Sequence, residues 1–449
     1  MNTNTSSQIE RTRYSFLLEV AVLFFLILSI PYDLALFESL SNGSVFSFEN
    51  LFQLATYRTS FVPESEYAGG NVIGYYNWII ALFVAVVFVV VFGRSTRNKL
   101  SLDDDSIYYW LRVLLRYRLA LAITFIGIVK VIPIQIPEPT LSELHTEYGD
   151  FMLWKLYYLT NGIATAGYLP VIGALEVVAG LFLLNRRTAV IGAGLLLATL
   201  LNVVIVNYVY EIGEQVYSSF LLLVAFTIFL HDLPRFFNLL VKNNAATPDQ
   251  FIPHFTQSIW KYRPYLQVVF LIIIGSFSVV AYGVWKDSNY PFPKQEGVSR
   301  WKGVYDVEDF VWNGDSIAHS LTDSLRWKDV VFEAWNTVSV RSNLKFPADS
   351  LKPKIAANRL RDYEFLGNAS RKFFSYTYKK EKGKRTAKLR LTDRRNSKNT
   401  FTFSVKEKAP NILILSGSDQ LGNSLNVTLQ QQQKRYLIKE GRRNPIKIY

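Results

Sequence analysis

The residues of this 449-residue sequence that could do chemistry are ionisable side chains inside apolar stretches. Lys130 and Glu176 lie in two successive stretches, and Glu19 lies in an earlier one. A charge at bilayer depth costs at least about 2.5–3.5 kcal/mol, so it usually faces a bundle interior or a watery cavity. We therefore expect Lys130 and Glu176 to lie close together, as a packing ion pair or as a polar pocket for a ligand or proton. Independent snorkelling of Lys130 to the membrane surface is the third interpretation.

Three arginines near the start of one apolar stretch form a second group of candidates. Arg112 and Arg116 are four residues apart and share a helix face, whereas Arg118 points elsewhere. Such side chains commonly extend to the lipid phosphates. The alternative is a site for an anion or for the headgroup of a quinone, which is the cofactor that the sequence leaves open.

Polar residues near the end of a later apolar stretch would complete such a pocket. They are Asn202, Asn207, Tyr210 and Glu211, to which Arg112 and Arg116 would be added. Asn side chains in membranes join helices through hydrogen bonds worth roughly 0.6 kcal/mol on average. Helix packing is therefore the simpler interpretation of the two asparagines.

The absence of cysteine excludes disulfides, thiolate nucleophiles, Cys-ligated zinc and iron–sulfur clusters. With only four histidines, we predict no metal site. His231, beside Asp232, is the one plausible axial ligand near the bilayer, although a polar cap at a helix end is the simpler role. No phosphate-cradling loop, nucleophile elbow or dinucleotide fingerprint occurs, and Gly192-x-Gly194 lies in an apolar stretch without a preceding strand. We assign no catalytic residue.

The elements that position these residues are apolar stretches close to the roughly 20 residues needed to cross a bilayer. Half of all residues are hydrophobic and only 19% are charged, which argues against an ordinary soluble enzyme. We predict a membrane bundle of about seven transmembrane helices, at about 14–33, 75–93, 110–133, 168–185, 188–207, 216–232 and 264–285.

Basic residues at the ends of these stretches predict their direction. With the N-terminus in the cytoplasm, the inner segments hold eleven Lys and Arg, whereas the outer loops hold only Arg58 and Lys155. This asymmetry favours a cytoplasmic N-terminus and places residues 286–449 on the far side, which is the periplasm in a bacterium. We therefore expect a multi-pass protein of the cell inner membrane, without a cleavable signal peptide.

One outer segment, 148–167, has an ambiguous pattern. It is helical and rich in aromatic residues at its start but ends in Thr160, Asn161 and Gly162. Because aromatic rings favour the headgroup level, an interfacial helix is the first interpretation. A re-entrant half-helix is the second.

Residues 286–449 differ from the rest in charge and in periodicity. They hold 32 Lys and Arg against 17 Asp and Glu, whereas residues 1–285 hold 17 against 19. Short strands at about ten-residue spacing predict an all-β antiparallel sandwich or small barrel that folds alone. The alternating apolar patterns lie at 304–312, 329–340, 373–378, 387–391, 400–405, 412–415, 425–429 and 436–438.

The basic character is strongest in Arg371–Lys398, which holds twelve Lys and Arg against two acids. A charged edge hairpin is the simpler interpretation, because edge strands are commonly protected by charge. Docking onto anionic lipid headgroups or onto an acidic partner is the alternative. Nucleic acid is not an expected partner outside the cytoplasm.

Three short motifs support a family resemblance. They are Gly127-Ile-Val-Lys130, Gly173-Ala-Leu-Glu176 and the turn Arg186-Arg187 before the small-residue stretch 189–201. In these motifs, residues 107–240 resemble the DoxX family of bacterial four-helix membrane proteins, and 207–211 more loosely fits a variety with an appended β domain. The resemblance implies membrane complexes linked to electron transfer and redox defence, including a quinone-linked thiosulfate oxidase subunit. It transfers no catalytic mechanism, because the family lacks a common active-site motif.

These observations predict four segments and leave three functions open. In this prediction, residues 1–106 form two helices with an outer loop, and residues 107–241 form a DoxX-like domain. Residues 242–287 form a cytoplasmic linker with the last helix, and residues 288–449 form a basic periplasmic β domain. The first function is a redox-associated, quinone-interacting membrane subunit. The second is a non-enzymatic membrane-anchored protein that presents the β domain to a membrane or periplasmic complex. The third is a transporter or binding protein for a small molecule.

Overall fold

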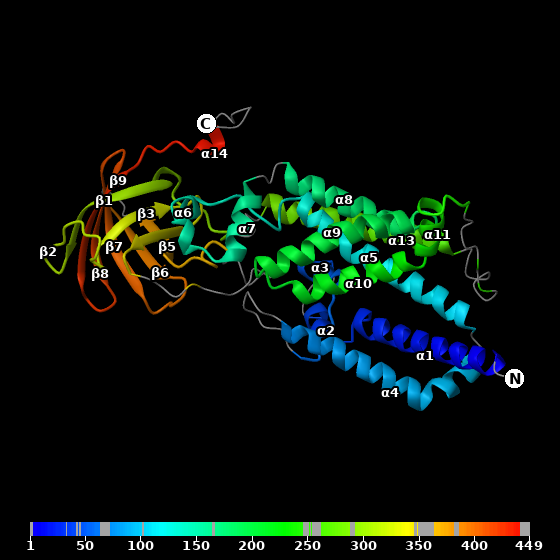
Figure 1. Ribbon diagram of the computed structural model, residues 1–449. Coiled ribbons are helices and arrows are strands. Elements are labelled where there is room, and N and C mark those ends of the chain that lie inside the picture. The colour runs from blue at the N-terminus through cyan, green and yellow to red at the C-terminus, as the bar shows by residue number, and fades with distance from the viewer. Residues whose placement is uncertain are drawn as a thin grey trace. The chain divides into compact units, whose positions relative to one another are not determined.

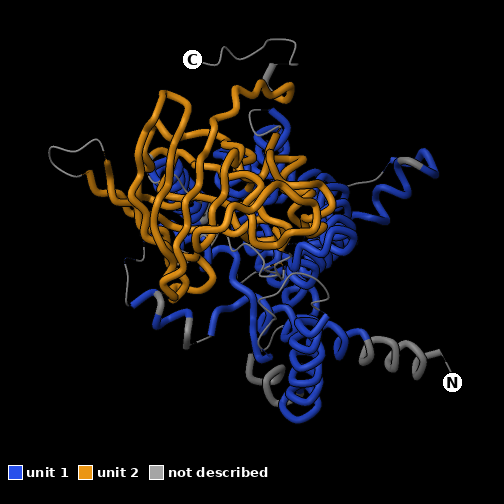
Figure 2. The backbone as a smooth tube through the Cα atoms, turned by 90° about the vertical axis from the view of Figure 1, so that its left-hand side faces the viewer, with its two compact units in different colours: residues 1–135, 166–285 blue, residues 136–165, 286–449 orange. Residues whose placement is uncertain are grey.

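The chain forms two compact units (Figures 1 and 2). Residues 1–135 and 166–285 form the helical unit, and residues 136–165 and 286–449 form the barrel unit, so the chain passes between the units three times. The computed structural model describes residues 3–32, 34–41, 44, 46–62, 72–100, 103–163, 167–245, 251, 253, 262–287, 292–344, 348, 363–380 and 386–440.

The helical unit has helices at all seven predicted positions. Val72–Gly93, Ala189–Val209 and Pro264–Lys286 are long and apolar enough to cross a membrane, and α10 with α11 would make a fourth span despite a bend of 57°. The unit contains α1 (Thr3–Ser29), α2 (Leu34–Ser41), α3 (Phe48–Ala55), α4 (Tyr75–Leu100), α5 (Asp104–Val131), α8 (Tyr168–Leu183), α9 (Ala189–Val209), α10 (Gln215–Leu230), α11 (Leu233–Leu240) and α13 (Arg263–Asp287).

Seven transmembrane helices are not supported by length and composition. The apolar parts of α1 and α8 are only Tyr14–Ser29 and Tyr168–Leu183, which are shorter than a typical span. The charged residues of α5 include Arg112, Arg116 and Lys130. Within the described residues, the helical unit is therefore that of a membrane protein with three spans, or four if the bent pair is one span.

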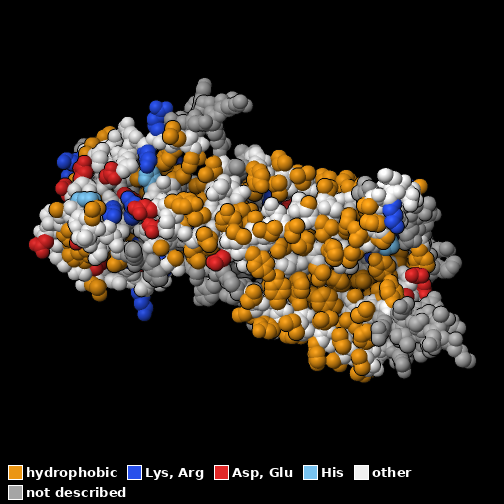
Figure 3. Space-filling model, in the orientation of Figure 1, with side chains coloured by type: hydrophobic (Ala, Val, Ile, Leu, Met, Phe, Trp, Pro, Cys, Tyr) orange, Lys and Arg blue, Asp and Glu red, His pale blue; other side chains and the backbone are white. Residues whose placement is uncertain are grey.

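Apolar side chains cover the outside of the candidate spans. Only 17% of the apolar segment of α13 and 28% of that of α4 are buried within the protein. Phe83 and Val90 on α4 are 68% and 69% exposed, and Figure 3 shows hydrophobic side chains gathered over the helices. Soluble monomers rarely expose such large apolar patches, so this surface fits the interior of a bilayer.

The backbones of α5 and α8 touch where the helices cross. A Cβ added to Gly127 would lie 2.7 Å from the carbonyl oxygen of Gly173, and one added to Gly173 would lie 2.5 Å from that of Gly127. A side-chain carbon cannot approach a backbone oxygen that closely, so both positions require glycine at this spacing. Small residues commonly allow membrane helices to approach in this way.

A phenylalanine cluster attaches α13 and α3 to α5. The ring of Phe277 on α13 stacks on Phe125 of α5 with centroids 4.0 Å apart, and on Phe48 of α3 at 5.6 Å. Phe277 is fully buried, although most of α13 is exposed. This ring therefore anchors an otherwise loosely covered helix.

The barrel unit contains a closed ring of eight antiparallel strands. The ring runs in the order β1-β3-β4-β5-β6-β7-β8-β9, and β9 closes on β1. The two-residue strand β2 pairs only with β1, outside the ring. The predicted sandwich or small barrel is therefore a barrel. Its strands are β1 (Gly303–Trp312), β2 (Asp315–Ser316), β3 (Trp327–Phe332), β4 (Thr337–Ser342), β5 (Arg371–Lys380), β6 (Thr386–Asp393), β7 (Thr400–Ala409), β8 (Ile412–Asp419) and β9 (Ser424–Gln431).

The interior of the barrel is filled by side chains. Alternating residues of the strands point inward, and Tyr305, Phe310, Phe332 and Phe403 are each at most 1% exposed. Eight-stranded barrels are just wide enough for side chains to fill them. The barrel is therefore a packed core and not a channel.

Two of the predicted strands differ from the structure. The predicted strand 329–340 is two strands, β3 and β4, because the chain turns at 333–336. The predicted strand 436–438 is wrong, since Leu437–Glu440 forms the short helix α14. The sequence Glu381-Lys382-Gly383-Lys384 predicts a turn between two strands, and it lies outside the described residues.

Residues 136–165, which we call the insert, fold with the barrel although they lie between α5 and α8 in sequence. The insert contains α6 (Leu141–Leu144), the 3-10 helix η2 (Tyr148–Asp150) and α7 (Leu153–Gly162). Phe151 forms a β-bridge with Asn368, and Trp154 is 1% exposed. Part of the predicted segment 107–241 therefore folds with the barrel unit. Neither interpretation of 148–167 anticipated this burial in protein.

Candidate functional site

Lys130 and Glu176 lie together, as their positions in the sequence predict. The Nζ of Lys130 is 2.5 Å from Oε1 of Glu176, and the two side chains are 12% and 3% exposed. Each residue follows a contact glycine by three positions, Gly127 in one helix and Gly173 in the other, so both charges lie on the contact faces. The two Gly-x-x-charge motifs thus describe one helix crossing.

The pair leaves one oxygen of Glu176 without a hydrogen bond. Oε2 is buried and has no hydrogen-bond partner among the described residues. A buried carboxylate oxygen without a donor costs free energy, so a proton or a donor group would be stabilised there. The arrangement can thus stabilise helix packing and can also accept one further proton or hydrogen bond.

Arg116 and Arg118 cap the ends of neighbouring helices. Nε and Nη2 of Arg116 donate to the carbonyl oxygens of Leu183 and Leu184 at 2.8 and 3.0 Å, at the end of α8. Arg118 donates to the carbonyl oxygens of Ala55, at 2.9 Å, and Tyr57, at the end of α3. Helix C-termini leave carbonyls that such donors satisfy.

Arg112 also has a partner at a helix end. Its Nη2 lies 3.7 Å from Oδ2 of Asp232, which follows α10. All three arginines are at most 8% exposed. Both predicted roles, extension to lipid phosphates and an anion or quinone site, are therefore replaced by bonds within the helical unit.

The four polar residues predicted at the end of α9 do not form a pocket. Asn207 is buried and donates to Oγ of Ser218 on α10 at 3.0 Å, which is the helix-joining role. Asn202, Tyr210 and Glu211 are exposed. Since Arg112 and Arg116 are held at other helix ends, the predicted group is not brought together.

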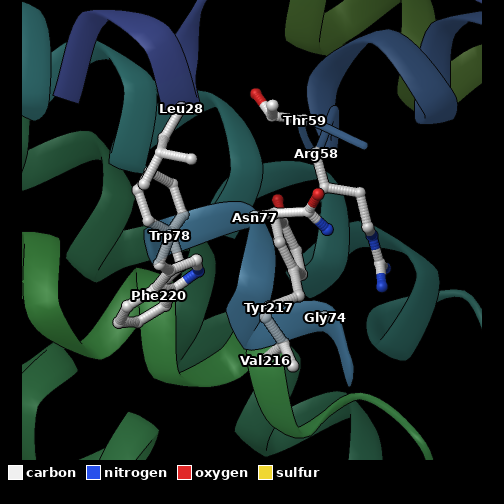
Figure 4. A pocket seen from close by; sticks show the side chains of 9 residues that line it. All are labelled: Leu28, Arg58, Thr59, Gly74, Asn77, Trp78, Val216, Tyr217 and Phe220. Atoms are coloured by element: carbon white, nitrogen blue, oxygen red, sulfur yellow. The ribbon is translucent and has the colours of Figure 1, made fainter. Parts of the chain in front are cut away.

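A small pocket that the sequence did not indicate lies near the same end of the helical unit (Figure 4). Its polar side is Arg58, which forms an ion pair of 2.6 Å with Glu214 and lies over the ring of Tyr217 at 4.6 Å. Trp78 and Phe220 form its apolar side. The cavity measures about 20 Å³, which suits a single water molecule and not a quinone ring.

Metal ligands do not cluster in the part of the chain that the structure describes. The ring of His231 lies 5.5 Å from that of Tyr108 at the end of α10, which fits a role at a helix end. We therefore do not assign His231 as an axial ligand.

The barrel unit contains a second set of charged residues, which we call the buried ionic network: Glu143, Lys155, Asp329, Glu333, Glu364 and Arg371. Lys155 of α7 lies 2.6 Å from Glu143 of α6, and both side chains are fully buried. Its Nζ also donates to the carbonyl oxygen of Tyr363 at 2.6 Å and lies 3.5 Å from the centre of that ring. The sequence had marked Lys155 only as a basic residue of an outer loop.

The other members of the network bind the insert to the strands. Glu333, after β3, accepts hydrogen bonds from the backbone N–H and hydroxyl of Ser142 at 2.7 and 2.6 Å. Arg371 of β5 donates to Asp329 at 2.6 Å and to the carbonyl oxygen of His145 at 3.0 Å. These bonds join strands β3 and β5 to a segment that lies far away in sequence.

Burial shifts the pKa values of this network. Desolvation lowers the pKa of Lys155, against the opposing effect of Glu143. It raises the pKa of Glu333 and raises that of Glu364 to about 7, although Thr337 and Trp335 donate hydrogen bonds to Glu364. All six residues of the network are at most 5% exposed, so the network positions the insert against the strands.

The basic stretch Arg371–Lys398 does not form a charged edge hairpin. β5 and β6 pair with neighbours on both sides, so the closed barrel has no edge there. Arg371 is buried, and Lys372 pairs with Asp393 at 3.1 Å. Its exposed members include Lys388 and Arg390 of β6, and residues 381–385 lie outside the described residues.

Substitution of both partners of the Lys130–Glu176 pair should cost less than substitution of either. Lys130→Met and Glu176→Leu each leave one buried charge uncompensated, which typically costs about 3–5 kcal/mol. We expect each single variant to melt well below the double variant in detergent. Additive losses in melting temperature would contradict the coupling. A stable double variant that fails to restore function in cells would assign the pair to a functional site.

The stability of the barrel unit should depend on Glu364 between about pH 4.5 and pH 7. Its pKa is raised from 4.5 to about 7 in the folded protein, so its stabilising contribution is full below pH 4.5 and is lost as the pH rises through 7. His145, whose pKa burial lowers to about 4, has the opposite slope at lower pH. We therefore compare Glu364→Gln with the natural protein at each pH by thermal unfolding. The melting temperature of the variant relative to the natural protein should rise with pH. The exposed Glu308→Gln should show no such trend, and a flat difference for Glu364→Gln would contradict the assignment.

Comparison with known proteins gives one relative with a limited match. No family model and no solved structure matches the chain. The Bacillus subtilis (strain 168) "Uncharacterized protein YwoB" is 30% identical over 123 residues, which are 27% of this chain and 77% of that protein. Because the match includes more than two thirds of the relative at this identity, the chain belongs, through that 123-residue stretch, to the family of YwoB.

Proposed function

We propose that this protein is a membrane-anchored interaction protein of the bacterial inner membrane, in which the helical unit holds a rigid barrel unit. The observation that carries the proposal is that the buried charged side chains bond to other parts of the protein itself. In the helical unit, Arg112, Arg116 and Arg118 bind helix ends, and the pocket beside Arg58 has room for about one water. In the barrel unit, the interior is filled and the ionic network is enclosed. Among the described residues, the outer surface of the barrel is polar and exposed, which fits contact with a partner.

The barrel unit is built from two separate chain segments, and this supports the proposed membrane topology. The chain leaves this unit at 165 and returns at 286, so both points lie on the same side of a membrane and an even number of crossings must separate them. The spans α9, α13 and the bent pair α10–α11 give three crossings. If the bent pair crosses the membrane, α8 must cross as well to give four, although its 16 residues extend only about 24 Å; without the bent pair, α9 and α13 alone give an even number.

Contacts within the helical unit fit the same orientation. Ser15 donates to Asp104 at 2.6 Å, which joins two segments predicted on the cytoplasmic side. The hydroxyls of Tyr75 and Tyr208 lie 2.7 Å apart and join two segments predicted on the far side. Together with the excess of basic residues in the inner segments, this supports a cytoplasmic N-terminus and a periplasmic barrel unit.

A redox-associated subunit of the DoxX type is the second candidate. It is favoured by the motifs around Lys130 and Glu176 and by the Oε2 of Glu176 that has no hydrogen bond among the described residues. Such a function needs a quinone or another redox group at this helix crossing. The arginines first considered for a quinone headgroup are bound to helix ends.

Topology can be measured with alkaline phosphatase fusions, since the enzyme is active only after export. A fusion after Tyr449 should be active, and a fusion after Arg187 should be inactive. A fusion after His145, in the insert, should be active as well, because the insert and the barrel share one side. Activity after Arg187 with none after Tyr449 would reverse the orientation. Opposite results after His145 and Tyr449 would contradict the inference that the insert and the barrel lie on the same side of the membrane.

Purified full-length protein distinguishes the two candidate functions. An interaction protein should carry no visible chromophore and no stoichiometric quinone when it is extracted in mild detergent. Extraction with organic solvent followed by chromatography measures the quinone. One quinone per chain, lost in Glu176→Gln but kept in the exposed variant Asn202→Ala, would overturn the proposal in favour of the redox subunit.

A further inference from the structure

Charge is segregated around the outer wall of the barrel. β1 presents the exposed acids Asp306, Glu308 and Asp309, whereas β6 presents the exposed bases Lys388 and Arg390. In the closed ring, β1 and β6 are separated by three strands in either direction, β3–β5 on one side and β7–β9 on the other. The acidic and basic strands therefore lie on opposite walls.

Four bases from three adjacent strands form what we call the basic wall: Lys379 of β5, Lys388 and Arg390 of β6, and Lys406 of β7. Lys379 and Lys388 are direct partners in the sheet, and Lys406 is the partner of Thr386, two residues from Lys388. Directly opposed residues have Cβ atoms about 4.5–5.5 Å apart, and diagonal neighbours are about 7–8 Å apart. The wall is thus a compact cationic surface.

The basic wall has no internal compensation. All four side chains are exposed, and none forms an ion pair with a described carboxylate. Like charges directly opposed in a sheet destabilise it. The described residues of the barrel therefore provide no counter-charge for Lys379 and Lys388, and an external anion would reduce their repulsion.

We propose that the basic wall binds the anionic phospholipid headgroups of a membrane surface, an inference that rests on the proposed interaction function and names its partner. The apolar helices tether the barrel unit to a bilayer, so headgroups are present at high effective concentration. Each Lys or Arg near an anionic surface strengthens binding by about fivefold. Four such residues together give roughly 600-fold if their effects are additive in free energy, enough to decide whether the wall is bound or free.

A second copy of the chain is a poorer partner for this wall. The acidic strand β1 of one copy has the charge to meet the basic wall of another. The barrel unit, residues 136–165 and 286–449, however, holds 33 Lys and Arg against 21 Asp and Glu, a net charge of +12. Two barrel units therefore repel each other at long range, whereas an anionic lipid surface attracts the whole unit as well as its basic wall.

Vesicle binding by the full chain tests the proposal. The natural protein in zwitterionic phosphatidylcholine nanodiscs is mixed with vesicles of phosphatidylcholine alone or with added phosphatidylglycerol, and bound vesicles are measured by flotation. We expect binding only to the anionic vesicles, weakened by salt. The variant with Lys379, Lys388, Arg390 and Lys406 all changed to Gln should bind at least tenfold more weakly.

The matched control removes the same charge elsewhere. Changing Lys294, Lys302, Lys328 and Lys434 to Gln lowers the net charge equally but leaves the basic wall intact, and binding should stay within about twofold. Equal loss in both variants would mean that net charge alone acts and would overturn the assignment to the basic wall. Both variants should keep the melting temperature of the natural protein, which excludes misfolding.

Two further outcomes separate this inference from the proposed function. Binding to inorganic polyphosphate without binding to anionic vesicles would overturn the lipid assignment but leave an interaction protein with an acidic partner. Stoichiometric quinone in the purified protein would overturn the proposed function, whatever the vesicles show. Binding of both vesicle types to the same extent would overturn the headgroup assignment alone.

Discussion

A charge that is removed from water must find a partner, and this constraint organises both units of the chain. In the helical unit, Lys130 and Glu176 meet where two glycines bring α5 and α8 into backbone contact. In the barrel unit, Lys155 is fully buried because Glu143 and the carbonyl oxygen of Tyr363 surround its ammonium group. Loss of one partner from such a pair is costly, whereas loss of both is often nearly neutral. Each pair therefore specifies which segments meet more than it adds to net stability.

Sequence reasoning succeeded where the pattern of one segment contains the information. The spacing of Gly127 to Lys130 and of Gly173 to Glu176 puts glycine and charge on one helix face, so the pair was predictable. The alternation of apolar residues predicted β5–β9, because the barrel buries one face of each strand. The closure of β9 on β1 was not predictable, since the alternation is the same in a sandwich.

Sequence reasoning failed where the partner is a backbone atom or a distant segment. Arg116 and Arg118 bind carbonyl oxygens, which have no signature in the sequence. The sequence therefore favoured extension to the lipid phosphates, with an anion or quinone-headgroup site as the alternative. The aromatic pattern of α7 fits a membrane interface as well as it fits a protein interior. Only the burial of Trp154 and Lys155 distinguishes the two.

The internal and external charges of the barrel unit have different consequences. Arg371 and Glu333 are held by the insert and strands, so their substitution would change the fold. Lys388 and Arg390 have no such role, because they stand on the outside of a closed ring. The basic stretch Arg371–Lys398 therefore has two roles: Arg371 belongs to the buried ionic network, whereas Lys388 and Arg390 are exposed on the barrel surface.

The position of the insert also determines the order in which the barrel unit is assembled. Ser142 precedes its partner Glu333 by 191 residues, and His145 precedes Arg371 by 226. At about 5–20 residues per second, synthesis separates Ser142 from Glu333 by roughly 10–40 s. During that time Lys155 and Glu143 lack the barrel segments that enclose them, and contacts between such distant segments form slowly. The insert is the first part of the barrel unit to be made and among the last to be enclosed.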